Sequence, residues 1–250
     1  MLDQTASQIA ALLLCALRLG PCLAFAPPFT LVKTPASVRA VLITGLAAAM
    51  LPPIPPETYP RTVTALLTAA LGELVVGLAL ALALQLGFAM IGVAGRSLDI
   101  QAGFGLAFMI DPTTRAQMPL IGALFVYAAA AIFFLTGAPQ DLLATLAMSY
   151  RQVPLGGAMV PENIGALLGL LGGASILALG ATGLAAAVLF AIDLVVAMLS
   201  RTLPQMNVLV LGFQVKAIAT ILVLPATIGL GAAAILRIIR LAIEAMPGFV

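Results

Sequence analysis

Long apolar stretches without charge alternate with short polar segments along the chain. Four uncharged runs each reach the roughly 20 residues that a helix needs to cross a bilayer: they cover 74–95, 116–140, 163–192 and 217–236. Two weaker candidates are Thr5–Ala26, which contains Arg18, and the short Ala40–Leu51. The pattern therefore predicts about six apolar helices, the second of them short.

Two of these helices are longer than a bilayer core requires. The third is expected over about Thr62–Gly95 and the fifth over about Pro161–Ser200, so each must tilt, bend or project beyond the bilayer core. Glycines recur along the fifth helix, with small-residue spacing at Gly165 and Gly169. Such spacing lets helices approach closely in lipid, either inside this chain's own bundle or against other subunits.

A polar central segment interrupts the apolar pattern at about residues 96–119, which read RSLDIQAGFGLAFMIDPTTRAQMP. It contains two acids, two bases, glycines on both sides of Phe104, and the helix-stopping pair Asp111-Pro112. Non-helical backbone at membrane depth persists only where protein or water satisfies its amides and carbonyls. Unless the segment is a simple exposed loop, we expect it to be non-helical and to line or block a passage.

Composition agrees with a membrane location. Hydrophobic residues make up 63% of the chain and charged residues 8%, with a mean hydropathy of +1.21. A soluble globular domain would carry about 25% charged residues. The chain is therefore predicted to be an all-α integral membrane protein.

Charge excludes one class of partner and leaves the topology open. The net charge is +2 and the basic residues are scattered singly, so the chain lacks the basic patch that nucleic-acid binding requires. Short cytoplasmic loops usually carry an excess of Lys and Arg. On a six-helix arrangement nine of the eleven basic residues divide four against five between the two sides, which does not orient the helices.

The residues available for catalysis or metal binding are few. Histidine is absent, which removes the usual base of a nucleophilic triad and the commonest zinc ligand. No phosphate-binding Gly-rich loop ends in Gly-Lys-Ser/Thr, and the aspartates form no protease signature. Cys15 and Cys22 are expected to be small buried apolar residues. The sequence predicts no enzyme, no cofactor and no metal site.

Isolated ionisable residues lie inside the apolar helices, where they are costly and often functional. Glu73, Asp193 and Lys216 each have apolar neighbours for most of a turn. The alternatives are ion pairs inside the chain or between subunits, or a position outside the hydrocarbon. Residues expected to make buried polar or intersubunit contacts are Glu73, Arg96, Asp99, Asp193, Arg201, Gln205, Asn207 and Lys216.

The segment Ser200–Lys216, SRTLPQMNVLVLGFQVK, enters the sixth apolar run. Pro204 breaks the chain there, and the amides of Gln205 and Asn207 can satisfy the freed backbone. Its Pro-Gln-Met-Asn-Val run, Gly-Phe and following lysine resemble the late signature of the FliR family, a type III export-apparatus subunit of bacterial flagella. The run from Asp99 to Ala107, followed by Asp111-Pro112, resembles that family's central loop.

The resemblance covers essentially the whole chain and implies one membrane-embedded domain over 1–250, built of helical hairpins. The family's central loop acts as a plug in the closed channel. Hydrophobic side chains can close a pore by excluding water. Plug residues carried over by position are Gly103, Phe104, Gly105, Phe108, Met109, Asp111 and Met118. Gln214 departs from the pattern, because many family members have proline after the Gly-Phe.

The resemblance also implies partners and a location. FliP-like and FliQ-like subunits would form the export gate with this chain, a FlhB-like subunit would dock alongside, and unfolded flagellar proteins would pass through. The chain would be located in the bacterial inner membrane at the flagellar basal body, in contact with lipid. The alternative is the related subunit of virulence injectisomes. The run Pro204–Val208 resembles the flagellar members more closely, which favours the flagellum.

Two other functions compete with export. A small-solute secondary transporter would use a broken helix as its binding site, but the sequence shows neither converging charges nor related halves clearly. A membrane scaffold protein without a conducting role also fits a chain of this composition.

Overall fold

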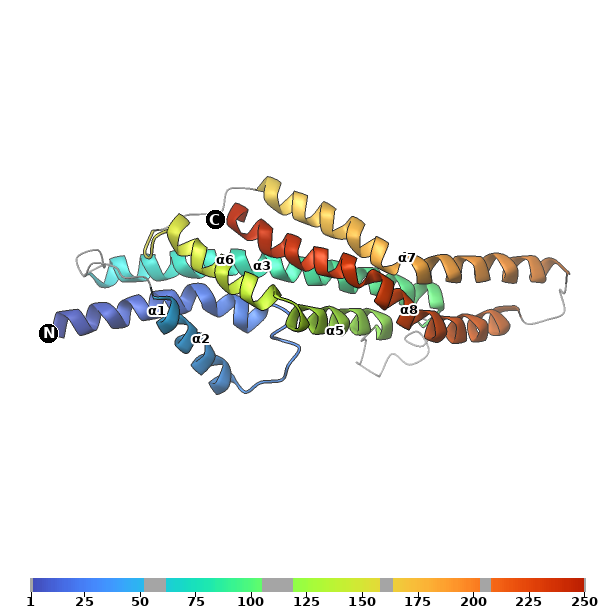
Figure 1. Cartoon of the computed structure of the whole chain (residues 1–250), viewed down its shortest axis with the longest axis horizontal. Helices are drawn as coiled ribbons and strands as arrows, with labels where there is room; N and C mark the ends of the chain where they lie inside the picture. The colour runs from blue at the N-terminus through green and yellow to red at the C-terminus, as the bar shows by residue number, and fades with distance from the viewer. Residues whose placement is uncertain (1, 52–61, 105–118, 158–163, 203–207, 250) are drawn as a thin grey trace. The chain divides into compact units, whose positions relative to one another are not determined.

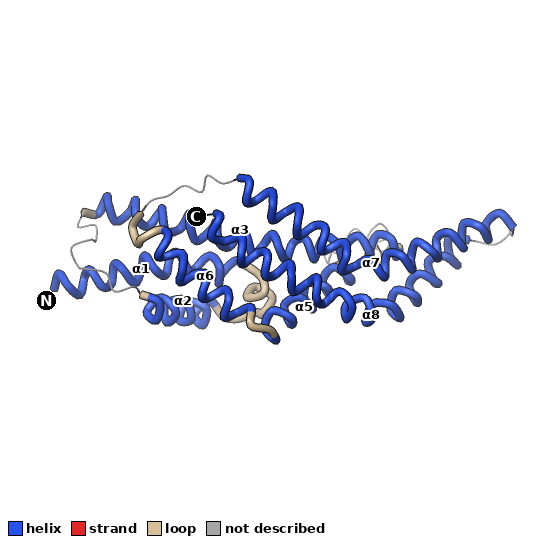
Figure 2. Tube along the Cα trace, turned by 45° about the horizontal axis from the view of Figure 1, so that its top comes forward, coloured by secondary structure: helices blue, strands red, loops and turns tan. Residues whose placement is uncertain are grey.

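The computed structural model describes residues 2–51, 62–104, 119–157, 164–202 and 208–249. All regular structure in these ranges is helical (Figure 1, Figure 2). The helices are α1 (Leu2–Phe25), α2 (Ala36–Met50), α3 (Val63–Ala102), α5 (Leu120–Leu135), α6 (Ala138–Gln152), α7 (Ile164–Thr202), α8 (Val208–Ala245) and the 3₁₀ helix η2 (Met246–Phe249).

Four helices of the described chain are long and apolar enough to cross a membrane, and they lie in α1, α3, α7 and α8 with η2. The helices α5 and α6 bend by 76° at the break between them and together make a possible fifth span. The expected count of six spans is therefore not confirmed. Helix α2 has 15 residues, fewer than the about 20 that cross a bilayer.

The central segment begins later than predicted. Helix α3 continues through Arg96 and Asp99 to Ala102, so the first part of the predicted non-helical segment is helical. The polar residues do not end the helix because Asp99 finds backbone partners on α5. The chain leaves the helix at Gly103, whose φ of +87° suits glycine.

The end of the uncharged run 116–140 also differs from expectation. A proline usually ends a helix, so the sequence predicts a helix end at Ala138-Pro139, but this pair instead begins α6, with Gly137 as the preceding residue. Proline is tolerated in the first turn because the backbone N–H groups there have no partner within the helix. The mixed polar and apolar residues of Leu142–Met159 are typical of an amphipathic connector, and this segment is helical as far as Gln152.

The chain divides into two compact units, and the boundaries fall inside α3, α5, α7 and α8. Unit 1 comprises Met1–Gly87, Phe133–Leu171 and Ile239–Val250. Its buried core includes Leu14, Leu80, Leu84, Leu142 and Leu146. Helices α1 and α3 approach closely in this unit, because a Cβ on Gly77 would collide with the carbonyl of Arg18.

Unit 2 comprises Phe88–Ile132 and Gly172–Ile238. Its core includes Phe88, Ile91, Leu98, Ile121 and Phe125. Close packing of α3 on α5 depends on two glycines, since a Cβ on Gly95 would lie 2.7 Å from the Cα of Gly122. Replacing either glycine would force the backbones apart.

Four glycines of α7 are not packed in this way. A Cβ added at Gly169, Gly172, Gly180 or Gly183 would meet nothing within 4 Å. Of the two uses expected for these glycines, packing inside the chain's own bundle is therefore not seen at these four positions. Packing against other subunits stays a prediction.

Candidate functional site

The end of α3 carries a complete helix-termination motif. The N–H of Gly103 donates to the carbonyl of Ile100 at 3.1 Å, and the N–H of Phe104 donates to the carbonyl of Asp99 at 3.0 Å. These are the two hydrogen bonds of a Schellman motif, with glycine at the left-handed position. The first residues of the central loop are thereby fixed relative to α3.

Asp99, in the last turn of α3, also binds the start of α5, the helix that follows the central loop. Its side chain is buried, with 2% exposed, and both carboxylate oxygens accept hydrogen bonds from the first turn of α5. The N–H groups of Ile121 and Gly122 donate to them at 2.9 Å each. A carboxylate at a helix N-terminus satisfies free amides and complements the helix dipole. One aspartate of α3 therefore caps the helix that follows the loop.

Lys216 of α8 holds the same turn from a third helix. Its ammonium donates to the carbonyl of Gln101 at 3.1 Å and forms an ion pair with Asp193 of α7. A cation at a helix C-terminus satisfies a free carbonyl and interacts favourably with the dipole. The side-chain amide of Gln101 donates to the carbonyl of Ala186 at 3.2 Å. The end of α3 is thus bonded to α5, α7 and α8.

Phe213 lies one helical turn before Lys216 and covers the start of the loop. Its ring meets the ring of Phe104 edge to face, with centroids 6.4 Å apart. A Cβ on Gly103 would lie 3.0 Å from this ring, so glycine leaves room for Phe213. We call Asp99, Gln101, Gly103 and Phe104, with Phe213 and Lys216, the loop root.

A second polar cluster, the polar hub, is buried inside unit 1 and centres on Arg18 and Glu73. The Nε of Arg18 lies 2.5 Å from Oε2 of Glu73, and Nη2 lies 2.9 Å from Oε1. The side chains are 0% and 1% exposed. Such a two-point contact matches the planar fork of guanidinium to a carboxylate. The hub joins α1 to α3.

The remaining groups of the polar hub come from α6 and the turn after it. Arg18 Nη1 donates to the carbonyls of Ser149 at 3.0 Å and Val153 at 2.8 Å, at the C-terminal end of α6. Its guanidinium carbon lies 4.5 Å from the centroid of the Tyr150 ring. Glu73 Oε1 accepts a further hydrogen bond from the N–H of Gly156 at 2.8 Å. Both buried charges are therefore well satisfied.

The comparisons with known proteins place the chain in a family. Residues 9–242 match the family described as bacterial export proteins, family 1. The chain belongs to this family. The flagellar biosynthetic protein FliR of Escherichia coli K12 is 26% identical over 200 residues, covering 79% of this chain and 76% of that protein. FliR of Bacillus subtilis 168 is 30% identical over 189 residues, covering 71% and 70%.

A differently named relative aligns over less of the chain. The surface presentation of antigens protein SpaR of Shigella sonnei is 27% identical over 154 residues, covering 61% of this chain and 59% of that protein. The resemblance to the FliR family inferred from two short motifs is confirmed. The chain is a membrane-embedded member of the export family, with several apolar helices.

The structure brings together part of the predicted site. Asp99, Asp193 and Lys216 meet at the loop root or beside it, with Gly103 and Phe104. Arg96 and Arg201 are exposed, so the buried polar contact predicted for them is wrong. Their contact with other subunits stays a prediction. The predicted residues that lie outside the described ranges are Gly105, Phe108, Met109, Asp111, Met118, Gln205 and Asn207.

Glu73 is buried in a polar contact, but the sequence did not identify its partners. In the sequence Arg18 reads only as an interruption of the first helix, Gly156 only as part of a connector between helices, and Tyr150 carries no signal of its own. The available signal was a lone base and a lone acid in two different apolar helices, each costly without the other. In the described residues no group of three or more Cys, Asp or Glu side chains could hold a metal ion.

Proposed function

We propose that this chain is a subunit of the flagellar type III protein export gate, in the bacterial inner membrane at the basal body. It forms the channel together with FliP-like and FliQ-like subunits, a FlhB-like subunit docks alongside, and unfolded flagellar proteins pass through. Family membership and the relatives named FliR support the export role. These relatives align over more of the chain than the SpaR relatives, which favours a flagellar system over an injectisome.

The observation that carries the proposal is the convergence of the two family motifs at the loop root. Phe213 and Lys216 belong to the late motif, whereas Asp99, Gly103 and Phe104 belong to the central one. Their side chains and backbone groups meet although more than a hundred positions separate them in sequence. A loop needs such an anchor if it is to occupy a defined place in a channel.

We further propose that the chain is one functional domain and that the loop starting at Gly103 closes the channel. Both ends of this loop are bonded to the last turns of α3, through the Schellman motif and through Asp99. Glycine allows the chain to turn where side chains would obstruct it. Phe and Met side chains further along the loop can exclude water and ions.

The exposed faces of α7 and α8 support contact with other subunits. In the most apolar 18-residue stretch of α3, half of the residues are buried within the chain. In the corresponding stretches of α7 and α8 only 17% and 22% are buried. Large apolar side chains face outward there, including Ile176 and Met198 on α7 and Leu222 and Leu230 on α8. We propose that FliP-like and FliQ-like subunits cover part of these faces and lipid the rest.

Two experiments test the proposal. Deleting the gene should abolish secretion of flagellar proteins and swimming, and the chain should co-purify with FliP-like and FliQ-like subunits. A chain that is monodisperse alone and transports a small solute would support the secondary transporter instead. Normal swimming with lost secretion of virulence effectors would support the injectisome.

The plug is tested by ion conductance of liposomes carrying the complete complex. Deleting residues 103–109 should preserve assembly, because the flanking helices supply the packing, but raise conductance. Combining Phe104→Ala with Phe108→Ala should raise it less, because the backbone still occupies the channel. A deleted complex that assembles and stays as tight as wild type would refute the plug.

A further inference from the structure

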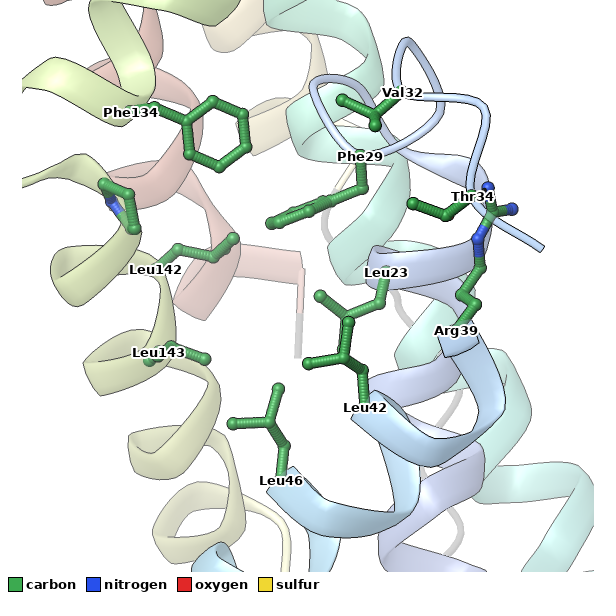
Figure 3. A pocket seen from close by; sticks show the side chains of 11 residues that line it. Leu23, Phe29, Val32, Thr34, Arg39, Leu42, Leu46, Phe134, Leu142 and Leu143 are labelled. Atoms are coloured by element: carbon green, nitrogen blue, oxygen red, sulfur yellow. Dashed lines mark hydrogen bonds between the residues drawn. The ribbon is translucent and has the colours of Figure 1, made fainter. Parts of the chain in front are cut away.

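Unit 1 contains an apolar cavity that the export role does not use. Its volume is about 280 Å³. One wall carries Leu23 of α1 with Leu42 and Leu46 of α2, and the opposite wall carries Leu142 and Leu143 of α6 (Figure 3). Its lining is almost entirely hydrocarbon, so water is a poor occupant of this space.

Packed aromatic rings form one end of the cavity. Phe29, Phe133 and Phe134 contact one another edge to face, with centroid distances of 5.9 Å, 6.1 Å and 5.2 Å. Phe29 and Phe134 line the cavity, and Phe134 is 50% exposed. The loop after α1 is thus packed against the end of α5, and the cavity beside these rings is accessible from outside the unit.

One cation stands at the edge of this cavity. Arg39 is the charged residue of the lining, and its guanidinium lies beside Thr34 (Figure 3). It donates to the carbonyl of Ala24 at 3.0 Å and to the hydroxyl of Thr34 at 3.4 Å. A guanidinium has five N–H groups, so it retains donors beyond these two contacts with the described residues. Arginine binds phosphate through two such donors at once.

We propose that this cavity binds an acyl chain of an anionic phospholipid whose phosphate is held by Arg39. An apolar slot with a guanidinium at its mouth matches the apolar tail and charged head of such a lipid. The free N–H groups of Arg39 suit an anion, which a phospholipid supplies next to its own apolar tail. The proposal rests on the membrane location and not on the export role.

The chain offers a clean optical test because it contains no tryptophan. Phe134→Trp places a fluorophore at the cavity, in the complete complex reconstituted in phosphatidylcholine vesicles. The wild-type complex gives the background from tryptophans of other subunits. Both lipids carry a phosphate, but the choline cation of phosphatidylcholine is repelled by Arg39. Dibrominated phosphatidylglycerol should therefore quench the introduced tryptophan at an about fivefold lower mole fraction than dibrominated phosphatidylcholine, the ratio expected for two like charges roughly 4 Å apart in water.

Two variants serve as controls. Adding Arg39→Gln should remove the preference between the two lipids while leaving quenching by either. Val63→Trp, at a residue of α3 that is 75% exposed, should be quenched equally by both lipids. Equal quenching by both lipids at the cavity, or a preference that survives Arg39→Gln, would overturn the proposal.

A second measurement does not depend on the fluorophore. After detergent washing, mass spectrometry should find more anionic phospholipid on the wild-type complex than on the Arg39→Gln complex. Soluble glycerol phosphate should not displace that lipid, because it lacks the tail. Equal lipid retention by the two complexes, or displacement by glycerol phosphate, would refute an acyl-chain site.

Discussion

The polar hub and the loop root use the same device in different surroundings. In each, a cation caps a helix C-terminus and pairs with a carboxylate: Arg18 caps α6 and pairs with Glu73, and Lys216 caps α3 and pairs with Asp193. The hub pair is 0% and 1% exposed, whereas the loop-root pair is 18% and 43% exposed. Exposure is therefore the main difference.

This difference in exposure predicts that the polar hub stabilises the fold, whereas the loop root positions the central loop. Breaking a buried pair leaves an uncompensated charge out of water, whereas an exposed pair contributes little to stability because water solvates its members separately. We expect the polar hub to hold unit 1 together. We expect the loop root to set where the central loop begins, at small cost when it is released.

The largest effect is expected for Arg18→Leu. Among the described residues Glu73 would keep only the N–H of Gly156 as a partner for its buried charge, so the free energy of unfolding should fall by about 3–5 kcal/mol. Thermal unfolding of the purified complex in detergent measures the loss. The double variant Arg18→Leu, Glu73→Leu should recover part of it. If the single and double variants were equally unstable, the unpaired charge would not be the cause.

A smaller loss is expected for Gly77→Ala in the same unit. The added methyl group would collide with the backbone of α1 at Arg18, and overpacking of this kind costs about 1–3 kcal/mol. Gly45→Ala in α2 is the matched control, since its Cβ would meet nothing within 4 Å. Equal melting temperatures for the two variants would show that close contact between α1 and α3 is not required.

At the loop root, Asp99→Asn tests the cap on α5. The amide keeps one acceptor oxygen but loses the charge, so one of two buried N–H groups loses its partner, at about 1–2 kcal/mol. The conductance of the complete complex should also rise, because the loop is less firmly anchored. Asp141→Asn is the control, because Asp141 is an exposed acid in the first turn of α6. Its effect on both measurements should be smaller, and an equal effect would contradict the assignment.

The smallest stability effect is expected for Lys216→Leu, at about 0–1 kcal/mol, because the pair is partly exposed. Conductance should nevertheless change more than with Arg240→Leu, an exposed base near the end of α8. Lys216→Arg should restore most of the wild-type behaviour. If Lys216→Leu destabilised the complex as much as Arg18→Leu, exposure would not explain the difference between the two sites.

Sequence alone determined the fold class and the family. Uncharged runs long enough to cross a bilayer predict helices because no water is available there for unpaired backbone groups. Helices α3, α7 and α8 agree, and so does α1, the weaker candidate that contains Arg18, whereas the run 116–140 is divided between α5 and α6. The central and late motifs were sufficient to indicate the export family, since each combines glycine, aromatic and charged residues in a fixed order. These features depend on neighbouring residues along the chain.

Sequence did not determine where the polar segments stop being helical. Arg96 and Asp99 suggested a loop because charge is costly in an apolar helix, but α3 continues to Ala102. The cost is removed by the N-terminal amides of α5, which supply partners for Asp99 from a helix that begins 21 residues later. Likewise, Pro139 begins α6 because it falls in a first turn, where its missing N–H has no consequence.

Tertiary structure alone decided which charges are partners. Arg18 and Glu73 are separated by 55 positions, and hydropathy gives each residue a cost without saying which group offsets it. The close approach of α1 and α3 at Gly77, together with the turn at Gly156, places the two side chains in contact. Likewise, the helices α3 and α8 bring Gln101 to Lys216. The strength of such pairs depends on distance and burial, and only the packed helices fix those two quantities.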